Sequence, residues 1–139
     1  QAHAQALDAP WPTLAEMIEG GKRLVVFTEG QLGGAPAWLM NVWAHTFETH
    51  YHFESPASMS CAINRGKAGN ALFLLNHFLT APTASAKWAD QVNHNPFFQD
   101  RADDCEAERG HIPNLVAVDF YDIGDLFAVV DALNGVTDN

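Results

Sequence analysis

Short apolar runs rich in β-branched and aromatic residues alternate along the chain with longer segments of helical period. This alternation is typical of βα units built around a parallel sheet. The runs within residues 23–28 and 115–120 are continuously apolar, as expected for strands that are covered on both faces. We therefore predict four strands, at residues 23–28, 51–54, 72–76 and 115–120.

The predicted helices carry start and stop residues. Thr13 and Glu16 have the spacing of a capping box, and Gly20 follows where that short helix should end. Pro36 suits the first turn of a second helix. The apolar residues that share one face of this second helix are Leu39, Val42, Trp43 and Phe47. We expect that face to lie on the sheet.

Two further helices are predicted in the second half of the chain. Phe98, Ala102 and Cys105 recur at helical spacing, and Gly110 closes their helix. The last helix spans residues 125–134. The remaining stretches, residues 55–70 and 80–95, are rich in turn-forming or small residues and are predicted to be loops. In βα barrels the loops after strands build the active face.

The length of the chain limits the architecture. A complete barrel of eight βα units takes roughly 250 residues, so 139 residues hold about half of one. We expect a single domain over residues 1–139, with residues 1–10 as a flexible lead-in that lacks the apolar core of a signal peptide.

Charge and hydropathy exclude some functions. The formal net charge is -10 and basic residues do not cluster, so nucleic acid is not an expected partner. The apolar runs are far shorter than the roughly 20 residues of a membrane span. Cys61 and Cys105 fit either one disulfide or two buried thiols.

Several segments together resemble a known family. They are residues 11–14 (WPTL), 22–27 (KRLVVF), 60–66 (SCAINRG), 74–78 (LLNHF), 113–121 (PNLVAVDFY) and 130–135 (VDALNG). In this order they are similar to the second half of secreted phosphatidylinositol-specific phospholipase C-like phosphodiesterases.

The resemblance implies an α/β fold, half of a distorted (β/α)8 TIM barrel in which this chain supplies strands five to eight. In that family a histidine pair from the first half acts as general base and general acid. An inositol hydroxyl attacks the phosphodiester to give a cyclic phosphate. We therefore expect a partner that completes the barrel: an N-terminal half, another chain or a second copy.

The resemblance also implies a site. Asp119, after the last strand, is the expected carboxylate that orients a catalytic histidine, with a solvated structural aspartate as the alternative. Arg65 is the expected phosphate contact, or else a surface ion pair. The other expected substrate contacts lie at or after strand ends: Thr28, Glu29, Asn76, His77 and Tyr121. The structural alternatives are an Asn76 that satisfies loop backbone, a structural His77 and a half-buried Tyr121.

Histidines are frequent near residue 50. His50 and His52, at the start of the strand predicted at residues 51–54, are expected to point to the same side and, with Glu48 or Glu54, could bind zinc. Solvated or loop-packing histidines are the favoured interpretation, because no further Cys or His follows at the spacing of a structural zinc site.

Three functions follow. The first is the substrate-side half of a phosphoric diester hydrolase that needs no cofactor. Its substrate would be a soluble phosphodiester or an inositol phospholipid. Such a protein would be secreted or extracytoplasmic, either in solution or peripheral to a membrane. The second is a non-catalytic module that holds a phosphorylated or polyhydroxylated ligand through Arg65, Asn76 and Asp119. The third is a metal-dependent glycerophosphodiester phosphodiesterase with a divalent cation near Glu29 and Asp119. The nucleophile and phosphate-loop motifs of other hydrolases are not found in the sequence.

Overall fold

Three parallel strands run side by side at the centre of the structure, a computed structural model that describes residues 1–136. They are β3 (Thr46–Thr49), β5 (Leu72–His77) and β6 (Leu115–Val118). The short strand β4 (Ile63–Arg65) pairs antiparallel with β3, which gives the order β4-β3-β5-β6. A second, two-stranded parallel sheet joins β1 (Val26–Thr28) to β2 (Leu39–Asn41).

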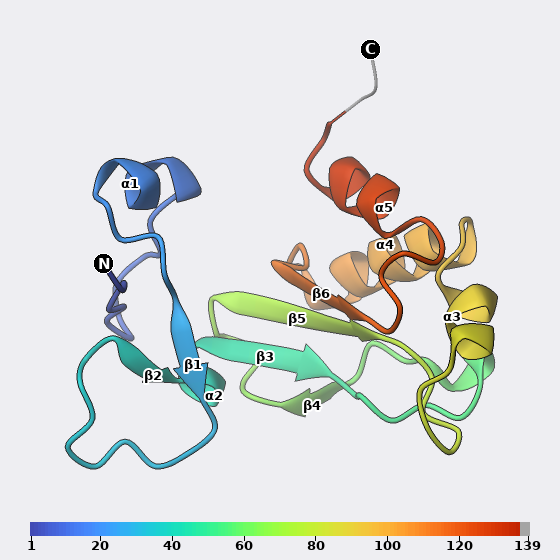
Figure 1. Cartoon of the computed structure of the whole chain (residues 1–139), viewed down its shortest axis with the longest axis horizontal. Helices are drawn as coiled ribbons and strands as arrows, with labels where there is room; N and C mark the ends of the chain where they lie inside the picture. The colour runs from blue at the N-terminus through green and yellow to red at the C-terminus, as the bar shows by residue number, and fades with distance from the viewer. Residues whose placement is uncertain (137–139) are drawn as a thin grey trace.

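The helices are distributed unevenly around the sheets (Figure 1). The two longest, α4 (Phe97–Arg109) and α5 (Leu126–Leu133), lie on one side of the four-stranded sheet. The short helix α1 (Leu14–Glu19) lies beside β1, and α3 (Ala86–Val92) lies at the far end of the molecule, where β3 and β5 end. The 3-10 turn η1 (Pro56–Ser58) precedes β4. None of the helices described is long and apolar enough to cross a membrane.

The main core fills the space between the sheet and the long helices. Successive side chains of a strand point to opposite faces, so alternate residues of β3 and β5 reach α4 and α5. The core residues are Phe47, Phe73 and Leu75 from the strands and Phe98, Ala102, Cys105 and Val129 from the helices. Phe47 and Phe73 stack with ring centroids 4.7 Å apart. The intervening residues, such as Glu48 and Asn76, belong to the other face.

Residues 39–49 behave as one extended segment interrupted by a single helical turn, α2 (Val42–His45). Its first part pairs with β1 and its last part with β5, and β5 in turn pairs with β6. The parallel strands therefore follow one another in sequence order, as a half-barrel requires. The described residues form no closed barrel, and the half-barrel itself stays a prediction.

Two predicted elements are wrong. The helix expected after Pro36 has only four helical residues, and the strand expected at residues 51–54 is irregular. Strand β3 forms instead, because its Thr and Phe residues favour extended structure and all four of its residues are buried. Consequently His50 and His52 do not lie on one face of a strand.

The other predictions agree more closely. In α1 the Glu16 N–H donates to Thr13 Oγ1 at 3.2 Å and the Thr13 N–H to Glu16 Oε2 at 2.7 Å, as the capping box requires. Gly110 ends α4 with a φ of 64°. Strands β1 and β6 are shorter than predicted. Strand β4 and helix α3 lie within the two stretches predicted to be loops.

Candidate functional site

A buried carboxylate, Glu48 of β3, organises the polar face of the sheet. Its side chain is 1% exposed. Its Oε1 accepts hydrogen bonds from Arg65 Nε at 2.5 Å and from Asn64 Nδ2 at 3.0 Å, and its Oε2 accepts one from Asn76 Nδ2 at 3.0 Å. A buried charge needs such partners, because an unpaired carboxylate away from water is strongly disfavoured.

Arg65 extends this network towards solvent. Its Nη1 donates to Glu29 Oε1 at 3.0 Å, and its guanidinium carbon lies 4.0 Å from the ring centre of Trp43 and 4.7 Å from that of Tyr51. The hydrogen bond to Glu48 is the main cause that raises the pKa of Arg65 above its ordinary value. We call Glu29, Glu48, Asn64, Arg65 and Asn76 the Glu48 cluster.

The strand register brings the cluster together. Glu48 pairs with Arg65 across β3 and β4, and with Leu74 across β3 and β5, two residues before Asn76. Gly66 lets the chain turn directly after Arg65: its φ is +81°, and a Cβ there would lie 2.0 Å from the Thr46 carbonyl oxygen. Side chains from three strands therefore converge on one face of the sheet.

Asp119 directly follows β6, at the end of the strand where Ala117 pairs with Asn76. If strand alternation continued from Ala117, the Asp119 side chain would turn to the side of Asn76. Asp119 is half-buried, and this burial raises the pKa of its carboxyl. A raised pKa is common for carboxyl groups at functional sites.

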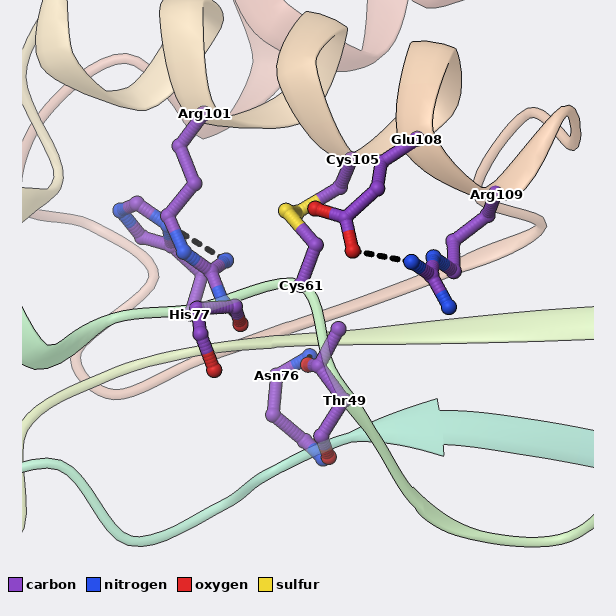
Figure 2. The surroundings of a disulfide bond; sticks show 9 residues. Thr49, Cys61, Asn76, His77, Arg101, Cys105, Glu108 and Arg109 are labelled. Atoms are coloured by element: carbon purple, nitrogen blue, oxygen red, sulfur yellow. Dashed lines mark hydrogen bonds and ion pairs between the residues drawn. A yellow bond between two sulfur atoms is a disulfide. The ribbon is translucent and has the colours of Figure 1, made fainter.

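His77 lies on the opposite face, although it is the neighbour of Asn76. Its Nε2 donates to the Val92 carbonyl at 2.8 Å, and its ring stacks on Phe98 at 3.8 Å. Figure 2 shows it directed towards Arg101 of α4, whose Nη1 lies 3.4 Å from His77 Nδ1. Burial lowers the pKa of His77 to about 4. The sheet therefore separates His77 from the Glu48 cluster, and a role in substrate binding stays a prediction.

The other predicted residues are not hydrogen-bonded to the Glu48 cluster within residues 1–136. Thr28 Oγ1 accepts from the Gly30 N–H at 3.1 Å, and Tyr121 is exposed. His52 Nδ1 is 3.0 Å from Thr80 Oγ1. Within residues 1–136, no group of three or more His, Cys, Asp or Glu side chains is placed to hold a metal ion.

A disulfide fixes the strand that carries Asn64 and Arg65. Cys61, just before β4, is bonded to Cys105 of α4 (Figure 2). Beside it, Arg101 Nη2 donates to the Ser60 carbonyl at 3.1 Å. The segment leading into β4 is thus held to the helix by a covalent bond and a hydrogen bond.

Part of this site has no predicted counterpart. Asn64 of the Glu48 cluster and the rings of Trp43 and Tyr51 beside Arg65 carry no predicted role, and Glu48 is predicted only as a neighbour of the histidines. The available signal was a single carboxylate inside the β-prone run Thr-Phe-Glu-Thr at residues 46–49. The helix predicted after Pro36 extends to Phe47, so this run was not predicted to be a strand.

An apolar hollow of about 540 Å³ lies at the start of the same strands. Leu72 and Leu115, which begin β5 and β6, line it together with Trp11, Leu14, Met17 and Phe27. Leu14 is 78% exposed and Leu115 is 43% exposed. The described residues therefore leave apolar side chains uncovered on the face that bears the Glu48 cluster.

Comparison with known proteins gives the family. A family model described as PI-PLC X 1 matches residues 2–134. An "Uncharacterized secreted protein" of Arthroderma benhamiae is 26% identical over 159 aligned positions, covering 99% of this chain and 36% of that protein. A "PI-PLC X domain-containing protein 1" of the same fungus is 26% identical over 138 positions, covering 91% of this chain and 45% of that protein.

A PI-PLC X domain-containing protein of Arabidopsis thaliana is 27% identical over 135 positions, covering 90% of this chain and 31% of that protein. The chain therefore spans less than half the length of these three relatives. No solved structure matches it significantly. Since the family model covers nearly the whole sequence, the chain belongs to the PI-PLC X domain family.

Proposed function

We propose that this chain is the substrate-side half of a phosphoric diester hydrolase of the phosphatidylinositol-specific phospholipase C-like type. The observation that carries the proposal is the Glu48 cluster, where β3, β4 and β5 bring one carboxylate, two amides and a guanidinium together, and Glu29, which follows β1, adds a second carboxylate. Amide and carboxylate groups suit the recognition of ligand hydroxyls.

The cluster favours hydroxyl recognition over phosphate recognition at Arg65 itself. Two of its nitrogens already donate to Glu48 and Glu29, so a phosphate would compete with carboxylates that hold the guanidinium. Glu29 is largely exposed, with 63% of its side chain accessible, and can accept from a ligand hydroxyl. Tyr51 and Trp43 offer flat surfaces for a sugar-like ring.

Asp119 has a separate role in the proposal. Its carboxylate would accept the N–H of a catalytic histidine, fix the tautomer of the ring and stabilise its charged form. None of the hydrogen bonds of the Glu48 cluster found in residues 1–136 involves a histidine. We therefore propose that the histidine pair comes from a complementary half, carried by a preceding segment or by another chain.

Secretion is part of the same proposal. The name of one relative describes a secreted protein, and disulfides such as Cys61–Cys105 persist in oxidising compartments. Both observations fit action outside the cytoplasm on a lipid or a soluble phosphodiester.

The test uses the protein with all of its native chains and phosphatidylinositol in detergent micelles. We expect ³¹P NMR to detect a cyclic inositol phosphate, and Asp119→Asn to lower turnover by about 10²- to 10⁴-fold, the usual range for losing acid–base assistance. Asp122→Asn, an exposed aspartate of the same loop, is the matched control and should retain activity.

Other outcomes would contradict the hydrolase. Full activity of Asp119→Asn would remove its proposed role. Binding of inositol phosphate without turnover would favour the non-catalytic module. Activity that a chelator abolishes and a divalent cation restores would favour the metal-dependent phosphodiesterase.

A further inference from the structure

Asn93 is a buried polar residue outside the Glu48 cluster. It is fully buried at the C-terminal end of α3, where its N–H donates to the Ala89 carbonyl at 2.8 Å. Buried amide side chains are usually hydrogen-bonded. Asn93 Nδ2 makes two hydrogen bonds, whereas its Oδ1 has no partner among the described residues. The partners of Asn93 therefore indicate what it does.

Those partners lie in the loop between β6 and α5. Asn93 Nδ2 donates to the carbonyls of Asp119 at 2.9 Å and Ile123 at 3.2 Å. The backbone carbonyl of Asn93 accepts from the Asp125 N–H at 2.8 Å. One residue thus holds the start, the middle and the end of residues 119–125.

The same loop has a constrained backbone. Phe120 has a φ of +54°, which is rare for a residue with a large side chain and persists only where the surroundings enforce it. The Ile123 N–H closes a turn by donating to the Phe120 carbonyl at 2.9 Å. At Gly124, with a φ of +89°, a Cβ would lie 2.3 Å from the Asn93 carbonyl oxygen. The loop is packed tightly around Asn93.

We infer that Asn93 is a positioning residue, which fixes the loop of residues 119–125 so that Asp119 and Tyr121 are held at the carboxyl end of β6. The functional part of this inference rests on the proposed function, because that proposal gives Asp119 its role. The structural part can be tested without any turnover.

The primary variant is Asn93→Leu, which keeps approximate size and adds no charge but removes both side-chain donors. Its matched control is Asn70→Leu in the β4–β5 connection, since Asn70 Nδ2 also donates to two backbone carbonyls, those of Trp43 and Thr46. Amide exchange by NMR is measured at Ile123 and Asp125. In Asn93→Leu we expect exchange to accelerate by roughly tenfold or more, as losing two buried hydrogen bonds implies.

A second readout is the titration of the Asp119 carboxyl by ¹³C NMR. Burial raises its pKa, so release of the loop should move that pKa back towards the ordinary aspartate value. Asn70→Leu should leave both the exchange rates and this titration as in the wild type. Unchanged exchange and titration in folded Asn93→Leu, or equal changes in Asn70→Leu, would overturn the inference.

If Asn93→Leu does not fold, Gly124→Ala gives the same test from the other side of the contact. Its methyl group would displace the loop from Asn93, whereas Gly110→Ala has a similar positive φ with nothing within 4 Å of its Cβ. Faster exchange at Ile123 in Gly124→Ala but not in Gly110→Ala supports the inference, and equal behaviour overturns it. A catalytically unimportant Asp119 would refute the proposed function alone, because these readouts do not depend on turnover.

Discussion

Glu48 combines two properties that are seldom found together, a full charge and nearly complete burial. Its three side-chain partners come from β4 and β5, so the carboxylate joins three strands. Hydrogen bonds to charged groups contribute about 1.5–3 kcal/mol each when a partner is removed. The residue should therefore matter for stability as well as for the site.

We predict that Glu48→Gln lowers the free energy of unfolding by roughly 2–3 kcal/mol, because Arg65 loses its buried counter-ion. Glu29→Gln is the matched control, since Glu29 pairs with the same guanidinium but is largely exposed, and it should cost about 1 kcal/mol or less. Urea denaturation measures both. Equal losses in the two variants would show that burial of Glu48 does not decide its contribution.

His77 gives the protein a pH dependence. Its pKa is about 4 in the folded chain, against an ordinary value of 6.5, so between these values the unfolded chain binds a proton that the folded chain does not. The free energy of unfolding should therefore fall by about 3 kcal/mol as the pH drops from 6.5 to 4. This follows because each unit of difference in pKa corresponds to about 1.4 kcal/mol.

Chemical denaturation at several pH values checks this prediction. His77→Gln removes the titrating group and should flatten the decline of the free energy of unfolding over that range. His94→Gln, in which 49% of the histidine side chain is exposed, is the control and should leave the decline as in the wild type. A steep decline that persists in His77→Gln would assign it to other groups.

At the scale of elements, the Cys61–Cys105 disulfide links the segment just before β4 to α4 across 44 residues of sequence. Closing a loop of this length stabilises a fold by roughly 4 kcal/mol in the chain-entropy model. We predict that the double variant Cys61→Ala and Cys105→Ala loses about this much free energy of unfolding. A reductant should destabilise the wild type similarly and leave the double variant unchanged, and insensitivity of the wild type would contradict the prediction.

The elements that were predicted best from the sequence are those whose ends are marked by neighbouring residues. The capping box of Thr13 and Glu16 and the glycine at the end of α4 depend on neighbouring residues only, and both are found. Strand β3 is different, because all of its residues are buried and no alternation of polar and apolar positions marks it. The apolar residues that precede it fit a helical period, and its pairing with β4 and β5 is what makes it a strand.

The site was predictable to a similar extent. Asp119, Asn76, Arg65 and Glu29 were predicted from strand ends or from a resemblance, and the structure places Asn76, Arg65 and Glu29 in one hydrogen-bonded cluster. The separation of Asn76 from His77 needed the strand register, because adjacent residues of a strand face opposite sides. The hydrogen bonds of Asn93 to the loop of residues 119–125 have no signal in the sequence.

At the scale of the whole molecule, the apolar hollow leaves the side chains of Leu14 and Leu115 exposed to solvent. Exposed apolar surface next to strand edges invites association. We predict that the 15.2 kDa chain associates with a complementary half or with a second copy, as light scattering would detect. Leu115→Asp should weaken the association, and Val136→Asp, at an exposed position that does not line the hollow, should not. A stable monodisperse monomer, with no complementary half bound, would contradict the half-barrel.

The contact between Arg65 and Trp43 has a practical consequence. An indole 4.0 Å from a guanidinium has emission that depends on where that charge lies, so the site contains its own optical probe. Any ligand that draws Arg65 away from Glu48 or Glu29 should change the fluorescence of Trp43. With the other three tryptophans replaced by phenylalanine, ligand affinity could be titrated in solution without a label and before the reaction is known.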